Sequence, residues 1–174
     1  QAAEQQRLAS VKLSYHDSTP LSAAEQTQWR AHYENLPEEF LAWLASGQRT
    51  GLSGSMEAEN YEYRLFNLRQ SQAWHTDFMG WLNLHRKSGP ELHKEIWQCI
   101  RDSGIDPARM VPILGDAHSP DGFLLRCDGG PGEYGAVYFW SHEEVPVFDK
   151  TTDSAQALMP WLAARLQAGE PFVL

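Results

Sequence analysis

Side chains able to do chemistry are concentrated between residues 110 and 144. The carboxylates Asp116, Asp121, Asp128 and Glu133 all fall in turn-forming segments between apolar runs. Paired carboxylates can perform acid–base catalysis if burial separates their pKa values. Aspartates in glycine-rich turns have a plainer role, because their side chains hydrogen-bond the local backbone. We therefore expect these four residues to cluster at one end of a sheet, as an electronegative binding face rather than a catalytic pair.

Histidine and cysteine offer two further chemistries. His118, His142 and Glu143 carry imidazole and carboxylate groups, which bind Zn²⁺ and harder transition ions. The sequence has no HExxH motif and no histidines paired at helical spacing. Nothing in the local sequence marks Cys99 or Cys127 as an activated nucleophile, so buried structural cysteine is the simpler interpretation. We expect no catalytic residue, no metal and no cofactor, with a metal-dependent hydrolase as the third hypothesis.

Three short strands must position these side chains. Residues 111–114 are apolar, as are Phe123, Leu124, Leu125 and Cys127 in the next strand, and residues 136–140 read AVYFW, a run dense in strand-forming residues. Between the last two, residues 128–132 read DGGPG, which favours an open or left-handed backbone over a regular element. A proline-containing edge strand is expected at residues 145–149.

Helices are expected before and after these strands. The pattern predicts a lead-in segment at 1–21, helices at 22–35, 37–46, 74–86, 91–103 and 155–166, a polar loop at 48–60 and a strand at 61–68. Ser22 and Glu25 form a capping-box pattern, and Pro160 indicates that the last helix is kinked or begins late. The prediction is a single α/β (α+β) domain over residues 1–174. Its mixed, mostly antiparallel sheet has about four to six strands, with helices packed mainly on one face.

The order of these motifs resembles the SUKH superfamily, which includes the yeast Smi/Knr cell-wall regulators, the Syd proteins and many bacterial immunity proteins. The matching segments are 36–44 (LPEEFLAWL), 113–116 (ILGD), 121–125 (DGFLL), 127–128 (CD), 137–143 (VYFWSHE) and the helix at 154–167. The sequence departs from the family pattern at residues 46–49 (SGQR) and at Ser141, where the family has Asn-Gly-Gly and aspartate. Compared with the family, residues 70–104 look like a helical insertion, where individual function is expected because insertions vary on a retained scaffold.

This resemblance implies an immunity protein, not an enzyme, that binds a cognate bacterial toxin and occludes its active site. Acidic turns would steer a basic toxin, and exposed aromatic side chains would supply the central contacts. The expected partner contacts are Asp116, Asp121, Asp128, Glu133, Tyr134, Trp140, Glu143 and Glu144, with Trp74 and Trp81 from the insertion. A cytoplasmic regulatory or scaffolding module is the alternative. For Trp140, a place in the core is a competing interpretation.

Composition limits the remaining possibilities. The 174 residues carry a formal net charge of −9, which repels phosphate backbones and disfavours nucleic-acid binding. A hydrophobic content of 42% and seven tryptophans argue against disorder. The two cysteines form no disulfide framework, and no apolar run reaches membrane-spanning length. No signal peptide is visible, although the chain starts at Gln1, so a cytoplasmic location away from membranes is expected. The toxin's identity and the oligomeric state are left open.

Overall fold

Seven strands form one sheet in strict chain order, β1 to β7, and every pairing between neighbours is antiparallel. The structure is a computed structural model, and it describes residues 12–17, 19–47, 51–56, 59–116, 119–143 and 148–168. The strands are β1 (Lys12–His16), β2 (Gly51–Met56), β3 (Glu59–Leu65), β4 (Met110–Asp116), β5 (Gly122–Arg126), β6 (Val137–Trp140) and β7 (Phe148–Thr152). The predicted α+β fold with a largely antiparallel sheet is confirmed, and the sheet is one strand larger than expected.

The helices occupy the connections between strands. They are α2 (Ala23–His32), α3 (Glu38–Ser46), α4 (Leu68–Leu82), α5 (Pro90–Ser103) and α6 (Leu158–Ala168), with a short 3-10 turn at Pro107–Arg109. The capping box predicted at Ser22 and Glu25 is confirmed by both of its hydrogen bonds. Pro160 lies in the first turn of α6, which confirms that this helix begins late. No helix in the described ranges is long and apolar enough to cross a membrane.

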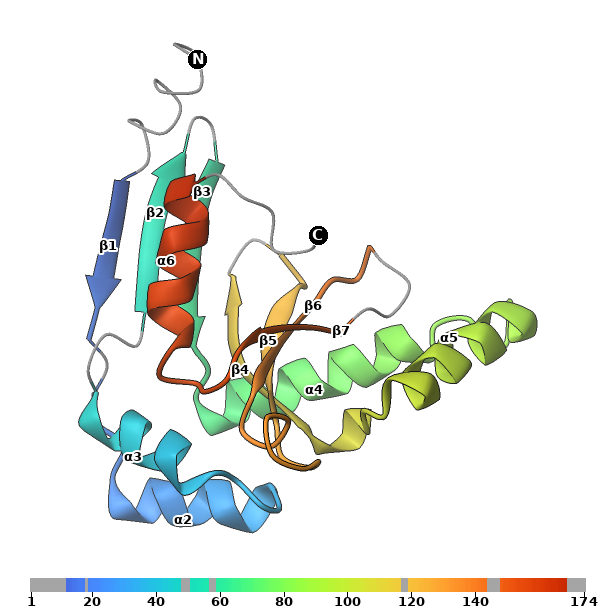
Figure 1. The fold of residues 1–174 in the computed structure, drawn as a ribbon, viewed down its shortest axis with the longest axis horizontal. Coiled ribbons are helices and arrows are strands. Elements are labelled where there is room, and N and C mark those ends of the chain that lie inside the picture. Colours follow the sequence, from blue (N-terminus) through green and yellow to red (C-terminus); the bar gives the residue numbers. More distant parts are fainter. Residues whose placement is uncertain are drawn as a thin grey trace.

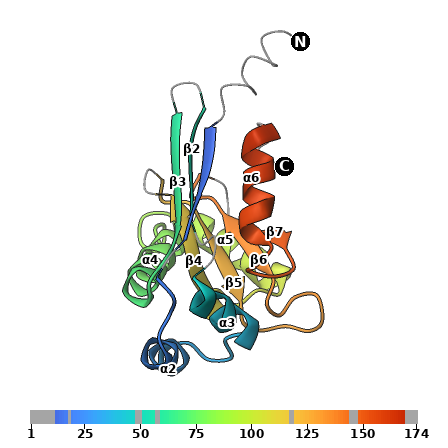
Figure 2. The ribbon, with the colours of Figure 1, turned by 90° about the vertical axis from the view of Figure 1, so that its left-hand side faces the viewer.

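Helices cover both faces of the sheet, so the expectation of helices mainly on one face is wrong (Figure 2). On one face, Val111, Phe123 and Val137 pack with α2, α3 and α6. On the other face, Leu124 and Tyr138 pack with α4 and α5. Neighbouring residues of a strand point to opposite faces, and β4, β5 and β6 are buried almost throughout. An uninterrupted apolar run such as AVYFW is what a strand covered on both sides requires.

The helices α4 and α5, together called the helical hairpin here, lie antiparallel and extend beyond the sheet (Figure 1). The first turn of α4 is fixed by a buried hydroxyl. Ser71 is fully buried, and its Oγ donates to the carbonyl oxygen of Pro112 in β4 at 2.6 Å. The hydroxyl of Tyr33, the residue that caps the C-terminus of α2, lies 2.8 Å from the same Oγ. This network ties α2, α4 and β4 together in the core.

Among the element boundaries that differ from the sequence prediction, three concern the sheet and the start of the helical hairpin. The loop expected at residues 48–60 contains β2, since pairing with β1 and β3 outweighs the weak strand propensity of its glycines and serines. The helix expected from Trp74 begins at Leu68 instead, because Asn67 and Gln70 form a second capping box. The edge strand β7 begins at Phe148, and residues 144–147 lie outside the described part.

Candidate functional site

The predicted contact residues are divided between the two ends of the sheet. Gly115 pairs with Gly122 at one end of the β4–β5 hairpin, whereas Met110 pairs with Arg126 at the other end. The turn after β4 and the loop after β5 therefore lie at opposite ends of β5, as successive turns in an antiparallel sheet must. Asp116 and Asp121 consequently lie at one end and Asp128, Glu133 and Tyr134 at the other. The expectation of one cluster of carboxylates is wrong.

At the glycine-rich end, the carboxylates hold a buried arginine. The Arg126 side chain is 7% exposed, and its Nε donates to Asp128 at 2.8 Å while its Nη2 lies 3.0 Å from Glu133. It also donates to the carbonyl of Gly104 at 3.0 Å and to the hydroxyl of Tyr138 at 3.3 Å. Burial alone would lower the pKa of Arg126, but its hydrogen bonds to Asp128 and Tyr138 and their charges raise it above the ordinary value. Asp128 and Glu133 therefore stabilise the loop after β5.

Tyr134 in the same loop is 44% exposed, and its hydroxyl donates to the carbonyl of Asn35 at 2.7 Å. A cavity of about 440 Å³ lies beside it. Two of the acidic side chains there are in ion pairs, since Arg30 pairs with Glu38 and Lys150 with Asp153, and the exposed Glu39 also lines the cavity. Part of the negative charge at this end is thus already compensated.

At the opposite end, Asp121 organises the start of the segment after β6. One carboxylate oxygen, Oδ1, accepts from the His142 backbone N–H at 2.8 Å and from its Nδ1 at 2.6 Å. The Ser141 hydroxyl donates to the other oxygen at 3.3 Å. Nearby, Asp116 accepts from the backbone N–H of Glu62 at 3.2 Å. These contacts fix the imidazole through Nδ1 and leave its Nε2 for another interaction.

Trp140 belongs to the core, which corrects its assignment as a partner contact. Its side chain is 3% exposed and contacts Phe78 and Trp74 edge to face, with ring centroids 5.1 and 5.8 Å apart. The residue ends β6 on the face that α4 covers, so its ring fills the space between helix and sheet. Glu143 is exposed, and Glu144 and His118 lie outside the described residues.

Helix α4 crosses the strands one after another as it runs toward the hairpin tip. Ser71 contacts β4, the Trp74 ring packs over Gly122 of β5, and Phe78 contacts both Trp140 of β6 and Phe148 of β7. The sheet ends at β7, but α4 continues for another turn. Trp81 therefore lies beyond the last strand of the described sheet and is 38% exposed.

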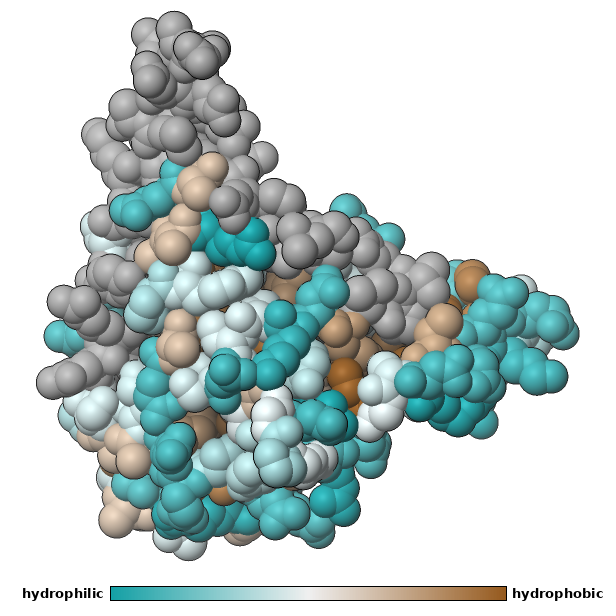
Figure 3. Space-filling view, in the orientation of Figure 1, coloured by the Kyte–Doolittle hydropathy of each residue, from teal (hydrophilic) through white to brown (hydrophobic). Residues whose placement is uncertain are grey.

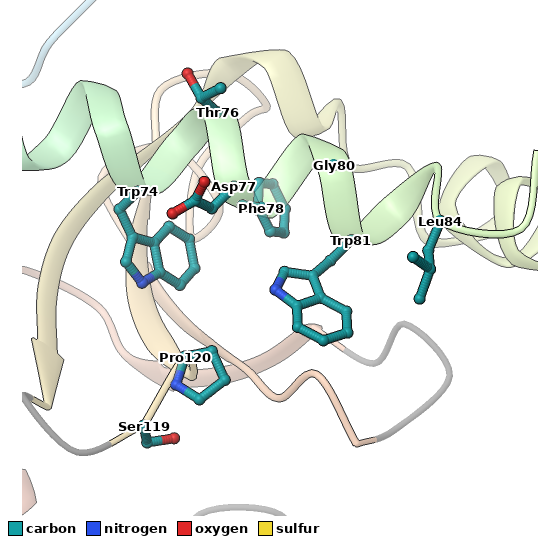
Figure 4. A pocket seen from close by; sticks show the side chains of 9 residues that line it. All are labelled: Trp74, Thr76, Asp77, Phe78, Gly80, Trp81, Leu84, Ser119 and Pro120. Carbon is teal, nitrogen blue, oxygen red and sulfur yellow. The ribbon is translucent and has the colours of Figure 1, made fainter.

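A cavity of about 500 Å³ lies where α4 extends beyond the edge of the sheet. We call it the hairpin cavity; its lining residues are Trp74, Thr76, Asp77, Phe78, Gly80, Trp81, Leu84, Ser119 and Pro120 (Figure 4). Leu84 is 55% exposed, and the Trp81 ring lies 5.2 Å from that of His142. Apolar surface is visible where the hairpin leaves the body of the protein (Figure 3). The structure thus brings Trp74 and Trp81 to one site with the Asp121–His142 pair.

Asp77, like Leu84, is a residue of this site that the sequence prediction missed. It is exposed, and its carboxylate has no hydrogen bond or ion pair with any residue in the described ranges. It falls within the aromatic stripe of α4, three residues after Trp74 and four before Trp81, so all three share one helix face. The sequence does contain a signal for this residue, because Asp77 is an acidic residue inside an otherwise apolar stripe of the helix.

The side chains of this site suit the binding of a partner better than covalent catalysis. In the described residues, no group of three or more His, Cys, Asp or Glu side chains gathers as a metal site would require. Burial raises the pKa of Cys127 to about 12, so its thiol stays protonated. Cys99 is exposed on α5. What remains is an open apolar cavity with one unpaired carboxylate and an oriented imidazole at its edge.

Comparison of the sequence with protein-family models and with curated proteins finds no match. The resemblance to the SUKH superfamily therefore stays a prediction.

Proposed function

We propose that this chain is an immunity protein that binds a cognate toxin through the hairpin cavity and occludes the toxin's active site. The observation that carries the proposal is the exposed pair Trp81 and Leu84 beside the unpaired carboxylate of Asp77. Binding energy at protein interfaces concentrates in a few aromatic anchors near a cavity, surrounded by a polar rim. The resemblance to the SUKH superfamily supplies the class of partner.

The charge of the chain supports a basic partner. A net charge of −9 attracts a cationic protein over distances of about a Debye length and speeds the encounter. Three of the six predicted contact carboxylates, Asp121, Asp128 and Glu133, already bind His142 or Arg126, so in this proposal they act through their long-range field rather than through direct contacts. Affinity in this proposal comes from the hairpin cavity, and the acidic surface mainly affects the association rate.

The test is capture of binding proteins from the native host with this chain as bait, followed by mass spectrometry and reconstitution. We expect one stoichiometric partner with a toxin domain, whose activity falls to zero at equimolar ratio. Trp81→Ala and Leu84→Ser should weaken binding by about tenfold or more. Leu92→Ser is the matched control, since Leu92 is 37% exposed on the same hairpin but does not line the cavity.

Two results would overturn the proposal. Capture of several housekeeping proteins, with no toxin among them, would favour the regulatory scaffold. A toxin complex that is indifferent to Trp81→Ala and Leu84→Ser would move the interface away from the hairpin cavity.

A second candidate function, a metal-dependent hydrolase using His118, His142 and Glu143, is favoured by one observation. Asp121 fixes His142 through Nδ1, and metal-binding histidines commonly have such a carboxylate behind them. Metal analysis of the purified protein tests it, and a preparation without stoichiometric transition metal that stays inactive after Zn²⁺ is added would exclude it.

A further inference from the structure

We infer that the hairpin cavity receives an arginine side chain of the protein partner, with its guanidinium at Asp77 and its alkyl chain along Trp81. The inference deepens the function proposed above and rests on it for the partner's identity. The chemistry of the cavity, in contrast, can be tested on this chain alone.

The Asp77 carboxylate is suited to an external cation because nothing in the described residues neutralises it. Asp121 is bound by His142, and Asp128 and Glu133 are bound by Arg126, yet Asp77 has no such partner. A carboxylate with free lone pairs beside apolar surface accepts a charge-assisted hydrogen bond, the stronger kind. The apolar neighbours also exclude water from one side of the contact.

Two indoles flank this carboxylate along the helix. Figure 4 shows Trp74, Asp77 and Trp81 leaving α4 beside the cavity, with Pro120 and Ser119 also lining it. Trp81 lies seven positions after Trp74, which corresponds to about 10 Å of helix rise. A cation beside Asp77 therefore lies between the two indoles along the helix, and the face of a tryptophan ring is the strongest aromatic partner for cations.

Arginine fits this arrangement better than lysine does. Its planar guanidinium stacks on aromatic rings, is weakly hydrated and binds a carboxylate through two parallel hydrogen bonds. Lysine offers a compact, strongly hydrated charge that would lose more solvation on entering. The cavity volume of about 500 Å³ also leaves room for the residues that flank the arginine in the partner.

Positive charge beyond the cavity restricts the orientation in which a partner segment can bind along the hairpin. Arg86 and Lys87 are exposed at the hairpin tip, just after Leu84. A partner arginine is therefore attracted toward Asp77 and repelled from the tip. A segment lying along the hairpin is expected to carry its basic residue at the Asp77 end and no basic residue at the tip.

The experiment titrates the ¹⁵N-labelled chain with N-acetyl-arginine amide and follows the indole N–H signals by NMR. We expect saturable shifts at Trp74 and Trp81. The neutral isostere N-acetyl-citrulline amide should cause none, and the lysine analogue should bind several-fold more weakly. Asp77→Asn should weaken arginine binding about tenfold. Glu95→Gln removes the same charge from an exposed site on α5 outside the cavity and should leave binding unchanged.

The outcomes separate this inference from the proposed function. Equal shifts with arginine and citrulline, or no shifts at all, would overturn the arginine site. A toxin complex weakened by Trp81→Ala but unaffected by Asp77→Asn would do the same and leave the immunity function standing. Arginine-specific shifts in a chain that captures no toxin would retain the cation site and refute the immunity function.

Discussion

Replacing Arg126 with methionine should destabilise the protein by about 3 kcal/mol. Methionine keeps the apolar stem but removes the guanidinium, which contacts Asp128, Glu133, Tyr138 and the carbonyl of Gly104. Each hydrogen bond that involves a charge contributes about 1.5–3 kcal/mol when buried. Asp128 and Glu133 are 23% and 51% exposed, so water recovers part of what they lose. The hydrogen bonds to Asp128 and Tyr138 therefore account for most of the loss, which comes to about 3 kcal/mol. This value lies at the lower end of the range measured when one partner of a buried ion pair is removed.

Urea denaturation followed by tryptophan fluorescence measures this loss. Arg126→Lys should lower the free energy of unfolding by about half as much, because the lysine ammonium keeps the charge but cannot bond all the partners that the planar guanidinium reaches. Arg101→Met is the matched control, since Arg101 is exposed and, among the described residues, its side chain hydrogen-bonds only that of Gln98; less than about 0.5 kcal/mol is expected. The denaturant dependence should stay unchanged in all three variants. A loss below about 1 kcal/mol for Arg126→Met would refute the view that this arginine holds the glycine-rich loop.

Three further outcomes follow from buried polar groups. Ser71→Ala should cost about 2 kcal/mol in urea denaturation, because the carbonyl of Pro112 loses a buried donor; an effect near zero would contradict this. Burial raises the pKa of Asp149, and its Oδ2 has no partner among the described residues. A raised carboxyl pKa weakens the folded state as pH rises through it, so Asp149→Asn should stabilise the protein at neutral pH but not below the ordinary pKa. A thiol-reactive dye should label Cys99 quickly in the native chain and Cys127 only after unfolding; rapid labelling of both would contradict the burial.

The sequence predicted the sheet core well because its signals are local. Residues 111–114, 123–127 and 136–140 combine strand-forming side chains with glycine-rich turns, and β4, β5 and β6 lie there. The cap at Ser22 likewise depends on a residue only three positions away, Glu25. β2 was missed because its strand character comes from pairing with β1 and β3, which a local pattern does not contain.

The candidate site was only half predictable for the same reason. The sequence placed Trp74 and Trp81 in a helical insertion expected to carry individual function, but it grouped Asp128 and Glu133 with Asp121. Antiparallel order alone separates them, since successive turns alternate between the ends of a sheet. Whether a carboxylate is paired also depends on a cationic side chain that is distant in the sequence. Arg126 binds Asp128 and Glu133, whereas Asp77 has no cationic partner in the described ranges.

The exposure of Trp81 follows from a mismatch between a helix and a sheet. The 15 residues of α4 span about 22 Å, and the four strands from β4 to β7 span about 14 Å between their axes. Trp74 and Phe78 therefore lie over strands, while Trp81 one turn later does not. The sequence shows the same apolar stripe at all three positions, so only the width of the sheet distinguishes core from surface. The same mismatch makes the hairpin cavity a place where α4 can carry a binding surface without disturbing the core.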